Sequence, residues 1–196
     1  MDDQKMVWTK IDEKPFKGAY KTYLTRTYKM PDGSTADFDV TYCKSAMFTG
    51  CLALTKDKNV ILSKEFRPGP EMVTYDQPMG EVDFGETPDE AVKRELREET
   101  GYEAKKWIAV NVDGYAAYPY GGSKGYAYIA LDCEKMHEQQ LGKYELIQVV
   151  VMPLKDFMND MLRKGKVCHP EIAWAAVDYM LQNKMITLED IAANNP

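Results

Sequence analysis

The sequence lacks any apolar run approaching the roughly 18 residues that a membrane-spanning helix needs, so we expect no membrane partner. Only two histidines are present, His137 and His169, which disfavours a histidine-rich zinc site and a Ser/His/Asp triad. The four cysteines include no Cys-x-x-Cys pair and are expected to be free thiols. The first five residues are polar and acidic rather than apolar, so we expect a cytoplasmic protein without a secretory signal.

An excess of positive charge is also missing. The 25 basic residues are outnumbered by 31 acidic ones, giving a net charge of −6, which disfavours binding to a nucleic-acid backbone. An acidic protein that handles anions needs a local source of positive charge, and a bound cation is the obvious one. The length of 196 residues predicts one domain of ordinary globular composition with a small appendage.

The order of the predicted elements indicates an α/β protein. Residues 17–30 and 37–43 read as two strands joined by a Pro-Asp-Gly turn, and further strands follow them. Helical patterns cover 154–164 and 171–183, and residues 188–193 are expected to add a short helix. We divide the chain into an N-terminal β extension, 1–46, and a body, 47–196.

One helix has unusually clear boundaries. Thr87 is a suitable N-cap, Pro88 fits the first helical position, and Glu90 completes a capping box with Thr87. Gly101 suits the position just after the last turn, where the backbone turns left-handed. The sequence therefore predicts a helix between these caps.

Three carboxylates share one face of this helix, because Glu95, Glu98 and Glu99 stand at positions i, i+3 and i+4. Their mutual repulsion requires either full solvation or a neutralising cation. Oxygen ligands of this kind favour hard divalent cations, so Mg²⁺ (or Mn²⁺) is expected here. Gly80 and Gly85 allow tight backbone turns just before the helix.

The pattern around these carboxylates is longer than an acidic cluster. It matches Gly-x5-Glu-x7-Arg-Glu-U-x-Glu-Glu-x-Gly-U, where U is a bulky apolar residue. Its fixed positions are filled by Gly80, Glu86, Arg94, Glu95, Glu98, Glu99 and Gly101. Leu96 fits the first U, and Tyr102 is an aromatic departure at the second. A chance match in this chain is about one in a million, and the chain is similar to the Nudix hydrolases.

The resemblance implies an α/β/α sandwich with a mixed sheet that hydrolyses a nucleoside diphosphate linked to another group, using divalent cations. The implied metal ligands are the Met79 carbonyl, Glu95, Glu98 and Glu99. Glu98 and Glu99 are also implied in catalysis, Glu98 by orienting water. Structural roles within the motif fall on Gly80, Glu86, Arg94 and Gly101.

The flanking residues resemble the ADP-ribose and NDP-sugar pyrophosphatase subfamily. The segment 64–68 carries an aromatic-Arg-Pro sequence in which Arg67 is expected to clamp a phosphate. Pro119 lies near a proline position associated with ADP-ribose hydrolases. Glu145 is the candidate general base, with Glu138 and His137 as alternatives. The subfamily also implies a homodimer built through the N-terminal strands.

Tyrosine and tryptophan side chains of the extension are candidates for base stacking or dimer packing: Trp8, Tyr20, Tyr23 and Tyr28. The favoured activity is hydrolysis of an ADP-ribose-like nucleotide sugar to a nucleoside monophosphate and a sugar phosphate. A dinucleotide or another nucleotide is the alternative substrate. A sensor without catalysis is a third reading, although such proteins commonly lose the carboxylates that this chain retains.

Overall fold

A computed structural model describes residues 6–18, 22–42, 46–116 and 118–192. The chain divides into two compact units. The first consists of Met1–Met47 and Ala116–Lys124, and the second of Phe48–Tyr115 and Gly125–Pro196. The first unit thus includes the segment 116–124, which lies far from the N-terminal strands in the sequence.

The first unit is a three-stranded antiparallel sheet in the order β1 (Thr9–Lys17), β2 (Thr22–Lys29) and β3 (Thr35–Tyr42). The predicted extension of antiparallel strands is therefore confirmed. The edge strand β1 was not predicted, because it is exposed throughout and its charged residues do not alternate with apolar ones. The segment 118–122 runs beside β3: the Thr41 N–H donates to the Tyr120 carbonyl at 3.0 Å, and the Gly122 N–H to the Thr41 carbonyl at 3.1 Å.

Aromatic rings pack on this small sheet. Trp8 contacts Tyr28 and Phe38, with ring centroids 6.1 and 5.3 Å away. Phe16 stacks on Tyr23 at 5.2 Å. Three of the four predicted aromatic candidates thus contact neighbouring rings, while Tyr20 lies outside the described residues.

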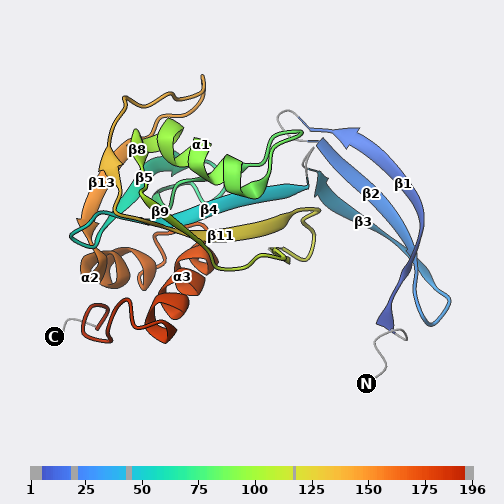
Figure 1. Ribbon diagram of the computed structural model, residues 1–196. Helices are drawn as coiled ribbons and strands as arrows, with labels where there is room; N and C mark the ends of the chain where they lie inside the picture. The colour runs from blue at the N-terminus through green and yellow to red at the C-terminus, as the bar shows by residue number, and fades with distance from the viewer. Residues whose placement is uncertain (1–5, 19–21, 43–45, 117, 193–196) are drawn as a thin grey trace. The chain divides into compact units, whose positions relative to one another are not determined.

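The second unit is an α/β/α sandwich, as predicted (Figure 1). Its main sheet has the order β10-β11-β4-β5-β13, with β6 paired to β5, β7 to β4 and β9 to β11. The strands are β4 (Met47–Leu54), β5 (Asn59–Arg67), β6 (Met72–Asp76), β7 (Met79–Glu81), β9 (Lys106–Ala109), β10 (Tyr115–Ala116), β11 (Lys124–Leu131) and β13 (Gln148–Pro153). A separate two-stranded ladder joins β8 (Tyr102–Glu103) to β12 (Glu134–Lys135).

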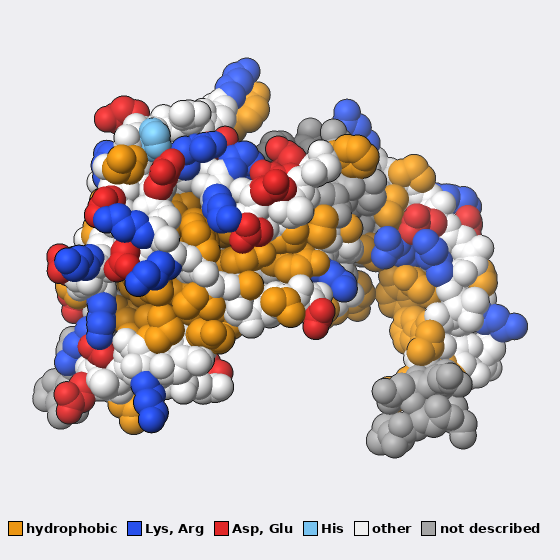
Figure 2. All heavy atoms as spheres, viewed as in Figure 1, with side chains coloured by type: hydrophobic (Ala, Val, Ile, Leu, Met, Phe, Trp, Pro, Cys, Tyr) orange, Lys and Arg blue, Asp and Glu red, His pale blue; other side chains and the backbone are white. Residues whose placement is uncertain are grey.

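Helix α1 (Pro88–Thr100) covers one face of this sheet, and α2 (Leu154–Asp156), the π-helical turn η2 (Phe157–Leu162) and α3 (Pro170–Gln182) cover the other (Figure 1). None of the helices in the described ranges has the length and apolarity needed to cross a bilayer. Basic and acidic side chains are interspersed on the visible face of this unit (Figure 2).

Alternation along the central strands builds two hydrophobic cores. On β4, Cys51 and Ala53 face the core that contains Val92 and Leu96 of α1. Their neighbours Leu52 and Leu54 face the larger core under α3. A strand buried on both faces must be apolar at nearly every position, which explains the continuous apolar run 51–54. The core that contains Val92 and Leu96 packs α1 against the sheet.

The predicted caps of α1 are confirmed. The Thr87 side chain accepts from the Glu90 N–H, and the Glu90 carboxylate accepts from the Thr87 N–H at 2.9 Å, which forms the capping box. Gly101 ends the helix with φ 74° and donates its N–H to the Arg97 carbonyl. These caps satisfy backbone groups that a free helix end would leave unpaired.

The predicted short helix at the C-terminal end is wrong over its described residues, 188–192. Asp190 accepts hydrogen bonds from the N–H and hydroxyl of Thr187, and the Asp190 N–H donates to the Thr187 carbonyl. These local bonds close a turn instead of continuing a helix.

Replacing Gly101 with alanine should lower the free energy of unfolding by about 3 kcal/mol, measured by urea denaturation. A Cβ at this left-handed position would overlap the carbonyl oxygen of His137, which adds a steric cost to the backbone strain. Gly165→Ala is the matched control, because Gly165 also has positive φ, at 68°, but nothing lies within 4 Å of its Cβ position. We expect about 1 kcal/mol for the control, and equal losses at the two sites would contradict this account.

Candidate active site

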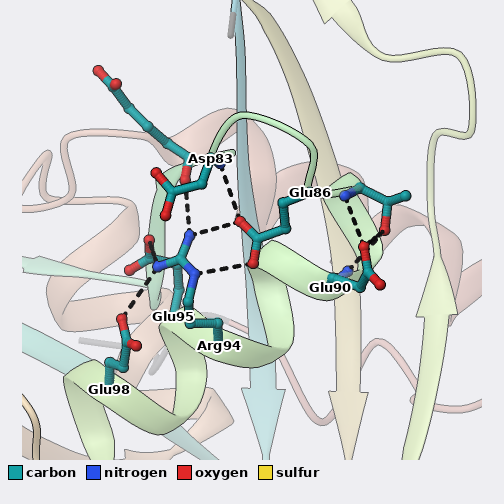
Figure 3. Close-up of polar contacts among 8 residues, drawn as sticks. Asp83, Glu86, Glu90, Arg94, Glu95 and Glu98 are labelled. Atoms are coloured by element: carbon teal, nitrogen blue, oxygen red, sulfur yellow. Dashed lines mark hydrogen bonds and ion pairs between the residues drawn. The ribbon is translucent and has the colours of Figure 1, made fainter. Parts of the chain in front are cut away.

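Arg94 of α1 organises the acidic face of the helix (Figure 3). Its Nε and Nη2 atoms donate to the two carboxylate oxygens of Glu86, each at 3.0 Å, which is a bidentate pair. Its Nη1 donates to Glu95 at 2.7 Å and to Glu98 at 3.2 Å, and Nη2 also donates to the Glu81 carbonyl at 3.0 Å. One guanidinium therefore links the loop before α1 to two carboxylates of the helix, and the neighbouring carboxylates raise the pKa of Arg94.

Glu95 packs its carboxylate against the backbone of Gly80, where β7 leads into the loop before α1. A Cβ on residue 80 would overlap that carboxylate, so a larger residue here would displace Glu95 from this position. Burial raises the pKa of Glu95, Arg94 lowers it, and the charges of Glu98 and Glu145 raise it further. Gly80 thus leaves room for the half-buried carboxylate of Glu95.

Glu99 is the most buried of the three helix carboxylates, with 8% of its surface exposed. Its Oε2 accepts a hydrogen bond from the Ser63 hydroxyl of β5 at 2.7 Å. Burial raises the pKa of Glu99 well above its ordinary value, and the charges of Glu95 and Glu65 add to the rise. An ionised carboxylate in this place needs a positive partner.

Glu65 joins this group, and sequence reasoning missed it as a site residue. It lies two residues after Ser63, so both side chains point to the same face of β5. Burial raises the pKa of Glu65, Arg67 lowers it, and the charges of Asp76 and Glu145 raise it further. The period-two alternation Ser63, Glu65, Arg67 was the available signal.

Arg67 is held from two sides. Its Nη2 lies 2.8 Å from Glu65, and its Nε donates to Asp76 at 3.1 Å. Asp76 is completely buried and also accepts from the Thr74 hydroxyl at 2.8 Å and the Cys168 N–H at 2.6 Å. These bonds fix the guanidinium of Arg67 on the same sheet face as Ser63 and Glu65.

Glu145 lies in the loop 136–147 between β12 and β13, which stands clear of the sheet in Figure 1. Its side chain is exposed and accepts from the Gly142 N–H at 2.7 Å. Its charge contributes to the raised pKa of Glu65 and to that of Glu95. Of the two alternatives, His137 pairs with Glu103 at 2.8 Å, and Glu138 is exposed in the same loop.

The two remaining predicted residues, Met79 and Pro119, lie in different units. Met79 opens β7 opposite Gly50 of β4, directly before Gly80. Pro119 is exposed and belongs to the segment 116–124 of the first unit, not to the unit that carries α1. The structure therefore brings together the motif residues, Arg67 and Glu145 in one unit, and puts Pro119 in the other.

The donor chemistry of the group suits a hard divalent cation. Its members are carboxylates, and burial raises the pKa of three of them, Glu65, Glu95 and Glu99. Across 6–18, 22–42, 46–116 and 118–192, no three His, Cys, Asp or Glu side chains are already placed as ligands of one ion. At α1, Arg94 donates to oxygens of Glu95 and Glu98, while the Ser63 hydroxyl donates to Glu99.

The sequence profile of the NUDIX domain matches residues 46–172, which is more than half of the chain. The chain belongs to the Nudix family. The match begins one residue before β4 and includes α1 with its capped carboxylate face. The resemblance inferred from the motif residues alone is thereby confirmed.

Relatives of this Nudix hydrolase include an ADP-ribose pyrophosphatase from Bacillus subtilis (strain 168), 26% identical over 164 residues, 83% of this chain and 86% of the relative. An ADP-ribose pyrophosphatase from Saccharomyces cerevisiae is 39% identical over 93 residues, 40% of this chain and 38% of the relative. A crystal structure of an ADP compounds hydrolase has the same fold, with a TM-score of 0.73 at 18% identity over 91% of this chain and 97% of that one. The chain is thus a Nudix pyrophosphohydrolase similar to the ADP-ribose pyrophosphatases.

Proposed function

We propose that this Nudix hydrolase cleaves a nucleoside diphosphate sugar of the ADP-ribose type with the help of a divalent cation. Water adds across one bridging P–O bond of the pyrophosphate, giving a nucleoside monophosphate and a sugar phosphate. The observation that carries the proposal is a group of half-buried and buried carboxylates, in which Glu95 and Glu99 belong to the family motif on α1 and Glu65 comes from β5. The names of the two pyrophosphatase relatives support the substrate class.

Four groups would hold Mg²⁺ (or Mn²⁺): the Met79 carbonyl, Glu95, Glu98 and Glu99. A bound cation supplies charge that neutralises the pyrophosphate and lowers the pKa of water. Glu95 is already pressed against Gly80, and Ser63 orients Glu99 from β5. Arg94, paired with Glu86, holds the loop to the helix. Its Nη1 atom also orients the carboxylates of Glu95 and Glu98.

Glu145 takes the proton of the attacking water in this proposal, and Glu98 orients that water. We favour Glu145 over His137 because the Glu145 charge contributes to the raised pKa of Glu95, whereas His137 is paired with Glu103. Glu138 is the remaining alternative. Pro119 stays a proposed substrate-binding residue on the strength of the subfamily resemblance.

Arg67→Lys should raise KM for ADP-ribose about tenfold while kcat changes less than threefold, because a lysine keeps the charge but loses the planar, doubly held guanidinium. We expect the remaining N–H groups of Arg67 to bind a phosphate oxygen. Steady-state kinetics on Arg163→Lys, a change at a surface arginine bonded to Asn159, gives the matched control. An unchanged KM in Arg67→Lys would remove Arg67 from the substrate site.

We also propose that the chain forms a homodimer through its first 46 residues and works in the cytoplasm, with residues 47–196 as the catalytic domain. Exposed aromatic and apolar residues on the three-stranded sheet support the first point: Trp8, Ile11 and Phe16 are each more than 40% exposed. The free thiols of Cys51, Cys133 and Cys168 fit a reducing compartment.

Product analysis on a panel of substrates tests the proposed function. Purified protein with Mg²⁺ is given ADP-ribose, GDP-mannose, UDP-glucose and a dinucleotide at equal concentrations. We expect AMP and ribose 5-phosphate from ADP-ribose at the highest kcat/KM. Preferred cleavage of the dinucleotide would establish the alternative substrate class, and tight ADP-ribose binding without any turnover would indicate a sensor.

A further inference from the structure

The carbonyl groups at the end of α1 are bonded to the beginning of the loop 136–147. A helix leaves its last four carbonyls without partners inside the helix. Here the Glu98 carbonyl accepts from the Gln140 N–H at 2.8 Å, and the Glu99 carbonyl accepts from the side-chain amide of Gln139 at 2.6 Å. The backbone of the two catalytic candidates of α1 is therefore tied directly to this loop.

The same amide nitrogen of Gln139 has a second partner on the far side of the loop. Its Nε2 donates to the carbonyl of Ile147 at 3.2 Å, and Ile147 is buried with 8% exposure just before β13. An amide NH₂ group carries two hydrogens, so it can serve both carbonyls. Gln139 and Ile147 flank the segment 140–146, and we call this pair its neck. The Gln139 side chain thus joins the two sides of the neck and bonds them to the end of α1.

The segment held by this neck has few other anchors. Tyr144 and Leu146 are 77% and 87% exposed, and Lys143 lies over the Tyr144 ring at 5.1 Å. A basic and a hydrophobic side chain project at the tip of the loop in Figure 2. Inside the segment, the Gly142 N–H donates to the Glu145 carboxylate and the Glu145 N–H donates to the Gly142 carbonyl at 3.1 Å. The position of Glu145 therefore depends on where the neck is fixed.

We propose that Gln139 is a positioning residue that sets Glu145 against the carboxylates of α1 by bonding the Glu99 and Ile147 carbonyls at once. The inference rests on the proposed function, in which Glu145 is the general base. Gln139 itself does not touch substrate. Because the neck is bonded to the main chain of Glu99, a change in the neck moves Glu145 relative to that helix without altering any carboxylate.

The test is a double-mutant cycle between Gln139→Met and Glu145→Gln, assayed with ADP-ribose and Mg²⁺. Methionine has the length of glutamine but no donor, so it removes both bonds with little change of volume. We expect Gln139→Met to lower kcat at least tenfold with KM within twofold of wild type, and to lower it less than twofold in the Glu145→Gln background. Gln182→Met, which removes an exposed glutamine bond to Asp178 on α3, is the matched control and should keep the wild-type kcat.

Hydrogen exchange of the substrate-free proteins gives a readout that does not depend on the proposed activity. Peptides covering 140–147 should exchange at least tenfold faster in Gln139→Met than in wild type, and at the wild-type rate in Gln182→Met. Unchanged exchange, or equal losses of kcat in both backgrounds, overturns the positioning role. If Glu145→Gln keeps full activity, Glu145 is not the general base, and this inference is then also overturned. If ADP-ribose is not turned over at all, the proposed substrate fails and the exchange result alone decides the inference.

Discussion

Glu99→Gln is expected to lower kcat for ADP-ribose about 10³-fold, the upper end of the loss that follows removal of one stabilising group from a preorganised active site. Glutamine keeps the shape of the side chain and can still accept from the Ser63 hydroxyl, so the fold around it should persist. What disappears is the negative charge that would hold a cation. Steady-state kinetics measures the loss, and Glu90→Gln, at the exposed capping position on the first turn of α1, is the control. A variant with more than a tenth of the wild-type kcat would exclude Glu99 as a metal ligand.

The same substitution should stabilise the protein when metal is absent. The pKa of Glu99 in the folded state lies well above its ordinary value of 4.5 because the group is buried. The folded state then binds the proton more tightly than the unfolded state, so stability is full below about pH 4.5 and falls as pH rises through the folded pKa. The side chain of Glu99→Gln does not titrate, so this variant lacks the loss of stability that wild type shows as the pH rises. In EDTA, its melting temperature should therefore exceed that of wild type by a margin that is larger at pH 8 than at pH 5.

Arg94→Met is expected to lower the free energy of unfolding by about 3 kcal/mol, because it leaves Glu86, Glu95 and Glu98 without their shared counter-charge. Urea denaturation at neutral pH measures the change. Lys93→Met on the same helix removes an exposed pair with Asp89 and should cost less than about 0.5 kcal/mol. Similar losses in the two variants would show that the Arg94 network is only a surface contact.

The local part of the site could be predicted from the sequence because its signals are local. The caps at Thr87 and Gly101 fix where α1 begins and ends, and the helical period then places Glu95, Glu98 and Glu99 on one face. The bidentate pair of Arg94 and Glu86 also lies within this one segment.

The features that could not be predicted from the sequence depend mostly on contacts between distant segments. Ser63 reaches Glu99 only because β5 runs under α1, a separation of 36 residues that no spacing rule reveals. The buried Asp76 bonds Cys168, which is 92 residues away. Strand β1 escaped prediction for a different reason, since an exposed edge strand needs no apolar alternation. The register of strands and the packing of loops on helix ends decide these features.

The most direct test of the central claim is the rate of ADP-ribose hydrolysis by wild type and Glu99→Gln with Mg²⁺, after removal of metal with EDTA, and after Mg²⁺ is restored. We expect wild type to form AMP and ribose 5-phosphate only when Mg²⁺ is present, and Glu99→Gln to stay about 10³-fold slower at saturating Mg²⁺. Hydrolysis by wild type that persists in EDTA, or a fully active Glu99→Gln, would contradict it.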